Sequence, residues 1–138
     1  MRFFLESWYV AIGAAIGANA RYWIGYFCKA STQPFPWPTL LINVLGSAML
    51  GAFTAAALVR GWGTNGRLFF AVGVCGGFTT FSTFSYEVIA TYYERSAKTA
   101  VLYAALSLVL SVGAAFAGGH FARTALSHPP ATQDPFKP

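Results

Sequence analysis

The sequence predicts an all-α integral membrane protein that crosses the bilayer four times. Only 9% of its 138 residues carry a fixed charge and 56% are hydrophobic, whereas about 25% of a typical soluble domain is charged. The few charges are also spaced so that long uncharged runs lie between them, and a helix needs about 20 such residues to cross a bilayer. This composition argues against a soluble enzyme and against a nucleic-acid-binding domain, despite the net charge of +5.

The first predicted span covers residues 4–27 and must accommodate two charges, Glu6 near one end and Arg21 about a turn and a half from the other. A cleavable signal peptide is the alternative, because the small residues Ala18 and Ala20 flank Asn19 in a pattern typical of cleavage sites. Cleavage there would discard the pair Gly13 and Gly17, whose spacing suits close packing of two helices. We therefore expect a retained span.

The second and fourth spans lie in uncharged runs. Residues 30–59 and 99–122 hold 30 and 24 residues without a fixed charge, and we place the spans at about 39–59 and 99–122. Residues 31–38 contain three prolines, which indicates an extended loop with an interfacial aromatic. The tail, 127–138, has four prolines and is predicted to be disordered, so the predicted four-helix transmembrane domain is 1–126. Cys28 and Cys75 are predicted to be free thiols.

The third span, about 68–93, is predicted to contain a broken helix between Gly76 and Thr80. Three glycines are followed within it by a cluster of five hydroxyl residues, at positions 79, 80, 82, 83 and 85. Irregular backbone at membrane depth is tolerated only where protein buries it or where it faces a water-filled cavity, and carbonyls freed by a break can bind cations. Ordinary helix packing by small residues is the alternative.

Other polar groups fall at helical spacings that suit the path of a small anion. Phe81 and Phe84 share a helix face, and a phenyl ring has a positive edge. Asn43 offers amide donors in the second span. In the fourth span a stripe of hydroxyls recurs every four residues, at Tyr103, Ser107 and Ser111. Such a stripe is also compatible with hydrogen bonding between helices alone.

Glu87 and the distribution of Lys and Arg bear on the mechanism and on the membrane orientation of the chain. Glu87 is the one acid deep within the chain, and we expect it to accept hydrogen bonds near the broken helix, with proton coupling as the alternative. The cations that set membrane orientation divide evenly, since Arg2, Arg60, Arg67 and Arg123 lie at one side of the predicted bundle and Arg21, Lys29, Arg95 and Lys98 at the other. A chain with so little bias can insert in both orientations and pair antiparallel; the alternative is a topology set by a partner or by one dominant charge.

Three stretches of this sequence resemble the Fluc (CrcB) family of fluoride channels. They are residues 76–87 (GGFTTFSTFSYE), 17–22 (GANARY) and 39–46 (TLLINVLG). The resemblance covers about residues 5–123, all four spans, and the first stretch is highly specific. Pro38 is a departure, because the family usually has Gly before the residue matching Thr39, and this puts the local loop geometry in doubt.

The resemblance implies an antiparallel, dual-topology homodimer in a bacterial inner membrane, with membrane lipid around it, two fluoride pores and no nucleic-acid partner. It also implies a central sodium ion that is not transported, held by backbone carbonyls of Gly76 and Thr79 from both subunits. Arg21 would lie at the pore vestibule, and Glu87 would be the acid after the break. The implied fluoride path is lined by Asn43, Phe81, Ser82, Thr83, Phe84, Tyr103, Ser107 and Ser111.

The expected function is therefore passive, fluoride-selective export, which is not an enzymatic activity. A small proton-coupled exporter of the four-helix type is the alternative, but it needs an acid in the middle of its first span, and Glu6 lies at the end. A membrane enzyme is disfavoured because His120 and His128 lack the spacing of a metal site or catalytic triad. A purely structural subunit would not need five hydroxyls around a helix break.

Overall fold

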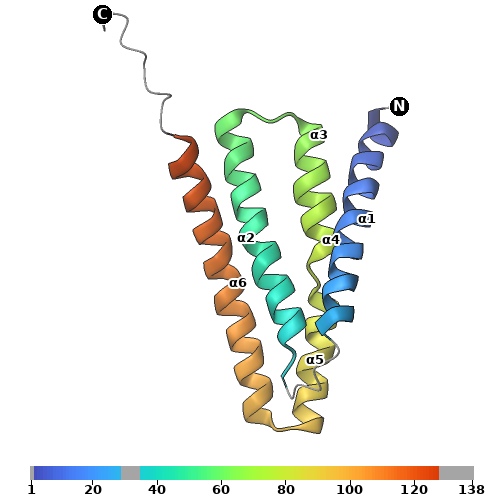
Figure 1. The fold of residues 1–138 in the computed structure, drawn as a ribbon, viewed down its shortest axis with the longest axis vertical. Coiled ribbons are helices and arrows are strands. Elements are labelled where there is room, and N and C mark those ends of the chain that lie inside the picture. Colours follow the sequence, from blue (N-terminus) through green and yellow to red (C-terminus); the bar gives the residue numbers. More distant parts are fainter. Residues whose placement is uncertain (1, 29–34, 128–138) are drawn as a thin grey trace, which may run out of the picture.

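The computed structural model describes residues 2–28 and 35–127, which form four helical runs (Figure 1). Three are α1 (Arg2–Cys28), α2 (Trp37–Arg60) and α6 (Ala97–Leu126). The fourth is a bent run made of α3 (Thr64–Arg67), the π-helical segment η1 (Leu68–Cys75), α4 (Gly76–Phe78) and α5 (Phe81–Glu94). The start of α1 and the end of α6 lie at the same end of the bundle, as four successive crossings require. The predicted all-α architecture with one interrupted helix is confirmed.

Three of the runs are long and apolar enough to cross a membrane by length and composition: α2, the bent run over 64–94, and α6. α1 has 27 residues, which is about 40 Å of helix, but it does not meet the same apolarity standard. Charged Glu6 and Arg21 and the polar tips of its aromatic side chains account for the difference. The predicted first span is therefore a helix, and its crossing of the membrane stays a prediction.

Local sequence sets where the helices begin and end. α2 begins at Trp37, two residues before the predicted span, because Pro38 occupies the first turn, where its missing N–H costs no helical bond. It ends at Arg60 and is followed by the capping residue Gly61, whose φ of 63° is a left-handed conformation that favours glycine. α6 begins at Ala97, directly after the capping residue Ser96, whose side chain accepts a hydrogen bond from the Thr99 N–H at 3.2 Å. Residues 31–34 of the predicted proline-rich loop and residues 128–138 of the predicted tail lie outside the described residues.

Glycines bring the helix axes close together at two contacts. The most extensive contact in the molecule joins α2 and α6, and the next joins α1 and η1. A Cβ atom on Gly51 would collide with the Ala115 carbonyl across the first contact, and one on Gly17 would collide with the Val74 carbonyl across the second. Small residues thus allow the backbones to approach, as they do between helices in membranes.

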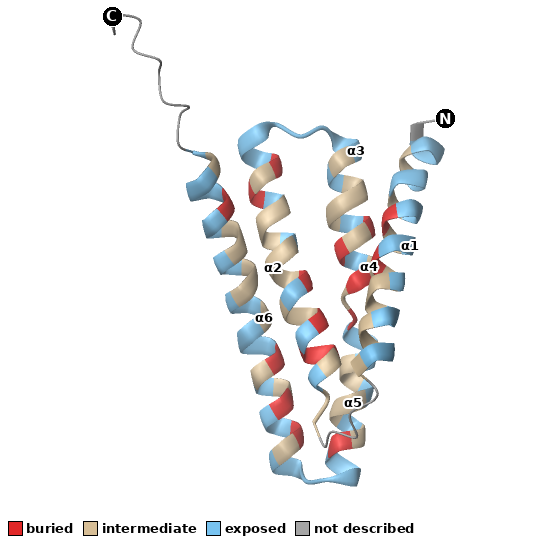
Figure 2. Cartoon of the chain, in the orientation of Figure 1, coloured by how far each residue is buried: buried red, intermediate tan, exposed pale blue. Residues whose placement is uncertain are grey.

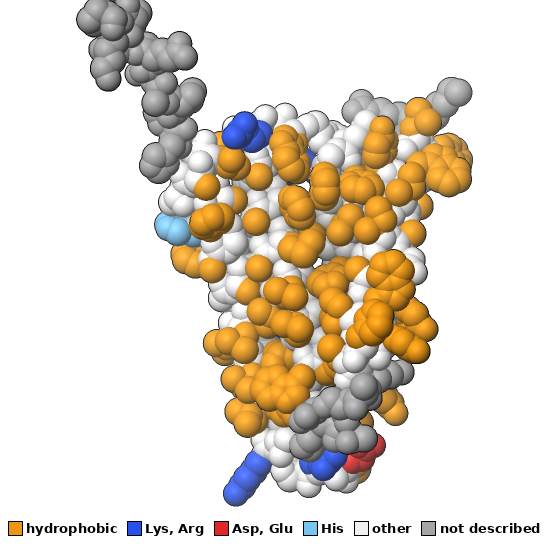
Figure 3. Space-filling model, in the orientation of Figure 1, with side chains coloured by type: hydrophobic (Ala, Val, Ile, Leu, Met, Phe, Trp, Pro, Cys, Tyr) orange, Lys and Arg blue, Asp and Glu red, His pale blue; other side chains and the backbone are white. Residues whose placement is uncertain are grey.

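The outer surface has the polarity that a bilayer requires. Figure 3 shows hydrophobic side chains over the length of the visible face, with Lys, Arg and acidic side chains gathered toward the ends of the bundle. Buried residues are few and lie along the lines where the helices meet (Figure 2). Large apolar residues such as Leu108, Val109 and Phe116 of α6 are more than 60% exposed, which is unfavourable in water and favourable against lipid chains.

Candidate functional site

The break in the third run consists of two extended residues, Thr79 and Thr80. Thr79 has φ −79° and ψ 159°, and Thr80 has φ −149° and ψ 116°. The predicted break at Gly76–Thr80 is thus narrower than expected, because α4 continues through Phe78. The Asn43 side chain of α2 pairs with the backbone of Thr80: Asn43 Nδ2 donates to the Thr80 carbonyl at 3.1 Å, and the Thr80 N–H donates to Asn43 Oδ1 at 2.8 Å. One side-chain amide therefore satisfies both backbone groups of Thr80.

Hydroxyl groups restart the helix after the break. Thr80 Oγ1 accepts a hydrogen bond from the Thr83 N–H at 3.2 Å, which is the usual side-chain cap of a helix N-terminus. The same oxygen lies 3.0 Å from Thr83 Oγ1 and 3.4 Å from Ser82 Oγ. On the other side of the break, Thr79 Oγ1 donates to the Cys75 carbonyl at 2.9 Å. The hydroxyl cluster seen in the sequence is therefore a local network around the break.

Glu87 joins three helices below the break. Thr39 Oγ1 of α2 donates to Glu87 Oε1 at 2.8 Å, and the Tyr103 hydroxyl of α6 donates to Glu87 Oε2 at 2.7 Å. Tyr103 has no exposed surface, and its ring lies between those of Phe84 and Phe35, with centroids 5.4 and 5.3 Å away. Both carboxylate oxygens of the half-buried Glu87 thus have a donor.

A groove of about 270 Å³ runs beside the break, between α2, α5 and α6. None of its lining residues is charged, and they combine an amide, five hydroxyls and two phenyl rings with three aliphatic side chains. The lining residues are Asn43, Ser47, Leu50, Thr79, Thr80, Phe81, Phe84, Ser107, Leu108, Ser111 and Val112. Neutral donors and ring edges can contact a small anion without the tight binding that a Lys or Arg ring gives, so release can be fast.

Two side chains of the groove have unused binding capacity. Ser107 Oγ is buried and has no hydrogen-bond partner among the residues that the structure describes, so it is available to a ligand. Phe81 is 79% exposed and its ring centroid lies 5.7 Å from that of Phe84. The groove thus offers a free hydroxyl on one wall and an uncovered phenyl ring on the other.

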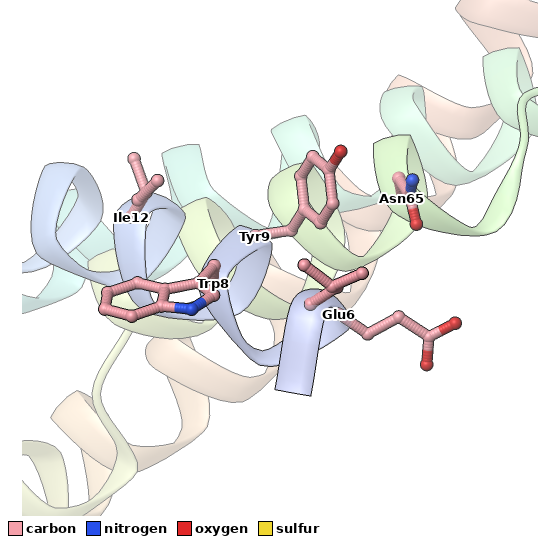
Figure 4. A pocket seen from close by; sticks show the side chains of 6 residues that line it. Glu6, Trp8, Tyr9, Ile12 and Asn65 are labelled. Carbon is pink, nitrogen blue, oxygen red and sulfur yellow. The ribbon is translucent and has the colours of Figure 1, made fainter. Parts of the chain in front are cut away.

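A larger hollow, of about 490 Å³, lies at the outer end of α1. Figure 4 shows Glu6, Trp8, Tyr9 and Ile12 projecting from α1 and Asn65 from α3. None of the residues that line it was predicted to be a site residue. Its position at the end of the bundle and its aromatic lining are typical of a protein surface at the membrane–water boundary.

Comparison with known proteins decides the family. Residues 8–119 match the family model described as CrcB-like protein, Camphor Resistance (CrcB). The chain belongs to the CrcB-like family.

Relatives of this CrcB-like chain are similar over most of their length. A protein of Nitrobacter winogradskyi named fluoride-specific ion channel FluC is 46% identical over 112 residues, covering 79% of this chain and 88% of the relative. A protein of the same name from Paramagnetospirillum magneticum is 42% identical over 122 residues, covering 86% and 94%. Another, from Ruegeria sp., is 46% identical over 121 residues with the same coverage. A family of membrane channels agrees with the three candidate spans, so the chain is a multi-pass membrane protein and not an enzyme.

The CrcB-like chain brings some predicted site residues together and leaves others apart. Asn43, Phe81, Phe84, Ser107 and Ser111 line one groove. Tyr103 lies outside the groove lining and donates to Glu87 instead. Ser82 and Thr83 are exposed beside the groove, Gly76 is exposed and Thr79 half-buried at the break, and Arg21 is half-buried near the end of α1.

Sequence reasoning missed three residues of the CrcB-like site: Thr39, Ser47 and Thr80. Thr39 is the second donor to Glu87, Ser47 lines the groove, and Thr80 carries the cap and both bonds to Asn43. Ser47 was detectable, because it lies four residues after Asn43 and therefore on the same helix face. Thr39 has no such local signal, since its partner is 48 positions away in the sequence.

Proposed function

We propose that this chain forms a fluoride-selective channel that lowers cytoplasmic fluoride by passive export of the anion across the bacterial inner membrane. The observation that carries the proposal is the uncharged groove beside a broken helix, lined by hydroxyl and amide donors and by Phe81 and Phe84. Relatives of the same family that are more than 40% identical are named fluoride-specific channels.

The chemistry of the groove suits fluoride better than chloride. A small, hard anion gains most from short hydrogen bonds, and Ser107 Oγ is a buried donor with no partner within residues 2–28 and 35–127. The ring edges of Phe81 and Phe84 carry partial positive charge that attracts an anion weakly. In acidic surroundings fluoride enters the cell as neutral HF, which dissociates at the higher internal pH. The anion is then trapped, because a bare charge crosses hydrocarbon poorly. A selective pore then lets it leave down its electrochemical gradient.

α1 is the first membrane span of the proposed channel, in addition to the three candidate spans. Exposed aromatic side chains gather at both of its ends, Trp8 and Tyr9 near the start and Trp23 and Tyr26 near the end. Trp and Tyr are enriched at both membrane–water interfaces. Between these groups the exposed residues include Ile12 and Ile16, so the helix presents an apolar middle flanked by aromatic belts.

A second copy of the chain, antiparallel to the first, is the proposed partner. Gly76, Ser82 and Thr83 are exposed at the break, in the middle of a candidate span. Lipid cannot satisfy polar backbone and hydroxyl groups at that depth, so protein or water must cover them. The even division of cations between the two sides of the sequence permits both orientations, which an antiparallel pair requires.

Sodium is the proposed structural ion at this interface, held by the carbonyl oxygens of Gly76 and Thr79. The residues present fit it, because the backbone around them is interrupted and a Cβ on Gly76 would meet only the Ala71 carbonyl oxygen, at 4.0 Å. Unwound carbonyls in membrane helices are suitable Na⁺ ligands. Among the described residues no group of three or more His, Cys, Asp or Glu that could hold a metal is present. Bound there, the ion would supply fixed positive charge between two copies.

Fluoride efflux from proteoliposomes tests the function. We expect the purified protein to release fluoride rapidly and not chloride, as read by ion-selective electrodes. Phe81→Ile should slow release by roughly tenfold, the effect of losing about 1.4 kcal/mol of interaction along the path. Phe116→Ile is the matched control, because Phe116 is similarly exposed, at 77%, but lies outside the groove.

Two results would contradict the channel. One is the absence of fluoride release from the wild-type protein. The other is release that requires an imposed proton gradient, which would favour the small proton-coupled exporter and direct attention to Glu87.

A further inference from the structure

We propose that the side chains of Asn43 and Thr80 are positioning residues that keep the carbonyl oxygens of Gly76 and Thr79 free for a cation. The inference rests on the proposed sodium site and adds two side chains to it, neither of which contacts the ion. It is carried by the hydrogen bonds on both sides of the break.

The Gly76 carbonyl loses its helical donor to Asn43. In an α-helix each carbonyl accepts from the N–H four residues later, so Thr80 would donate to Gly76. The Thr80 N–H instead donates to Asn43 Oδ1 at 2.8 Å. Asn43 thereby removes the donor that would occupy the Gly76 oxygen.

The Thr79 carbonyl loses its helical donor to Thr80. Its regular partner four residues later is the Thr83 N–H, which donates to Thr80 Oγ1 at 3.2 Å. A side-chain acceptor one residue away thus takes the bond. Neither N–H group that a continuous helix would supply to these two oxygens reaches them in the described part of the chain, and the oxygens belong to the two residues that the cation is proposed to use.

Neighbouring positions differ in a way that supports this assignment. The Cys75 carbonyl accepts from the Thr79 N–H at 3.0 Å and from Thr79 Oγ1 at 2.9 Å, and the Thr80 carbonyl accepts from Asn43 Nδ2 at 3.1 Å. Gly77 lies against the α1 backbone and Phe78 is buried, whereas Gly76 is exposed.

The arrangement also links the two ions of the proposed channel. Asn43 lines the groove proposed for fluoride and holds the backbone proposed for sodium. An amide nitrogen has two N–H groups, and one is used by the Thr80 carbonyl, so the second is available to the groove. A change at Asn43 should therefore affect both sites, whereas a change at Thr80 Oγ1 acts first on the cation site.

Sodium-dependent thermal stability is the decisive measurement, and it does not depend on fluoride flux. The purified protein in detergent is unfolded thermally across a series of NaCl concentrations, with KCl replacing NaCl at constant ionic strength. The sodium-specific shift gives an apparent sodium affinity, and stability in KCl alone reports any general structural damage.

Variants at Thr80 test the diverted Thr83 donor. Thr80→Val removes Oγ1 at nearly constant volume, so the Thr83 N–H loses its acceptor and the side-chain cap that fixes the backbone beside the break is lost. We expect apparent sodium affinity to fall about tenfold, the effect of about one hydrogen-bond equivalent. Thr80→Ser keeps the oxygen and should stay within about twofold of wild type. Ser85→Ala is the matched control, because it removes a hydroxyl of α5 whose bond, to the Phe81 carbonyl, lies away from the break.

Variants at Asn43 test independently whether the Thr80 N–H must donate to Asn43 Oδ1. They also provide a test of the inference in the event that Thr80→Val does not fold. Asn43→Asp keeps an oxygen that accepts the Thr80 N–H in either protonation state, whereas Asn43→Leu has none. We expect the sodium-specific shift to persist in Asn43→Asp and to be lost in Asn43→Leu.

The outcomes separate the two proposals. A wild-type protein without a sodium-specific shift would overturn the sodium site, and with it the role of both side chains. A sodium-dependent wild type whose affinity is matched by Thr80→Val, or by Asn43→Leu, would overturn the positioning role and leave the sodium site standing. Loss in Thr80→Val with rescue in Thr80→Ser supports the inference.

Discussion

At the scale of single residues, the arrangement around Glu87 changes how its role is understood. A lone acid within a membrane span suggests either a hydrogen-bond acceptor or a proton carrier. Thr39 and Tyr103 donate to its two oxygens from two other helices. Both carboxyl oxygens of Glu87 are therefore engaged, and the side chain joins α5 to α2 and to α6. The geometry favours the acceptor role, and Tyr103 is then as much a structural residue as a residue of the path.

Removing the Tyr103 hydroxyl should lower stability. Tyr103→Phe leaves Glu87 Oε2 without its donor in a buried site, and we expect the free energy of unfolding in detergent to fall by about 1–3 kcal/mol. Tyr92→Phe is the matched control, because Tyr92 lies on α5 and is 54% exposed, and its change should stay within about 0.5 kcal/mol. Equal effects of the two substitutions would contradict a structural role for the Tyr103–Glu87 bond.

At the scale of helices, the contact of α1 with the bent run determines where the break lies. Gly13 of α1 lies against Gly73 and Val74, and Gly77 of the bent run lies against Ala14. A Cβ on Gly17 would collide with the Val74 carbonyl, so no side chain fits between the two backbones. The part of the bent run before the break, η1 and α4, is therefore packed closely against α1. α5 resumes from a separate cap at Thr80 and packs mainly against α6. The break is the point where the run passes from one neighbour to another.

Gly17→Ala tests this contact. The added methyl group would overlap the Val74 carbonyl, so the two helices must separate, and we expect a loss of about 1–3 kcal/mol of stability in detergent. Gly25→Ala, on the same helix, is the control because a Cβ there meets nothing within 4 Å. Its effect should be neutral or stabilising by up to about 1 kcal/mol. A harmless Gly17→Ala would show that α1 does not depend on backbone contact with η1.

At the scale of the whole molecule, the single chain leaves polar and aromatic groups uncovered at membrane depth. Its groove is bounded by α2, α5 and α6 but leaves Phe81 largely uncovered, and the polar break is open at Gly76. Both features lie in a run long and apolar enough to be within the membrane. A second copy with the opposite orientation would cover them, and the balanced charges make that orientation accessible.

Shifting the charge balance should therefore control activity. Thr64→Lys with Asn65→Lys adds two cations at the exposed start of α3, which favours one orientation. We expect reporter fusions at the C-terminus to show a single topology and fluoride efflux to be lost. Co-expression with Glu94→Lys and Ala97→Lys, which bias the chain the other way, should restore efflux. The neutral pair Thr64→Gln and Asn65→Gln is the control, and efflux from a chain of single topology would contradict antiparallel pairing.

The fold was largely predictable because its signals are local. Uncharged runs located α2, the bent run and α6, and glycines beside hydroxyls located the break to within a few residues. The site was predictable as a set of residue types but not as a set of contacts. Asn43 was expected to line the anion path, and it does line the groove, yet its two hydrogen bonds go to a backbone 37 positions away in the sequence.

The helical fold, the place of the chain in a membrane and the interruption of its third helix follow from composition, charge spacing and glycine content, because these act on neighbouring residues. The partner of each polar group follows instead from how the helices pack. Thr39, Thr80 and Tyr103 carry no pattern that identifies Glu87, Asn43 or a diverted N–H as their partners. The reason is physical: a buried polar group must be satisfied by whatever donor the packing brings near it, and packing joins residues that are distant in sequence.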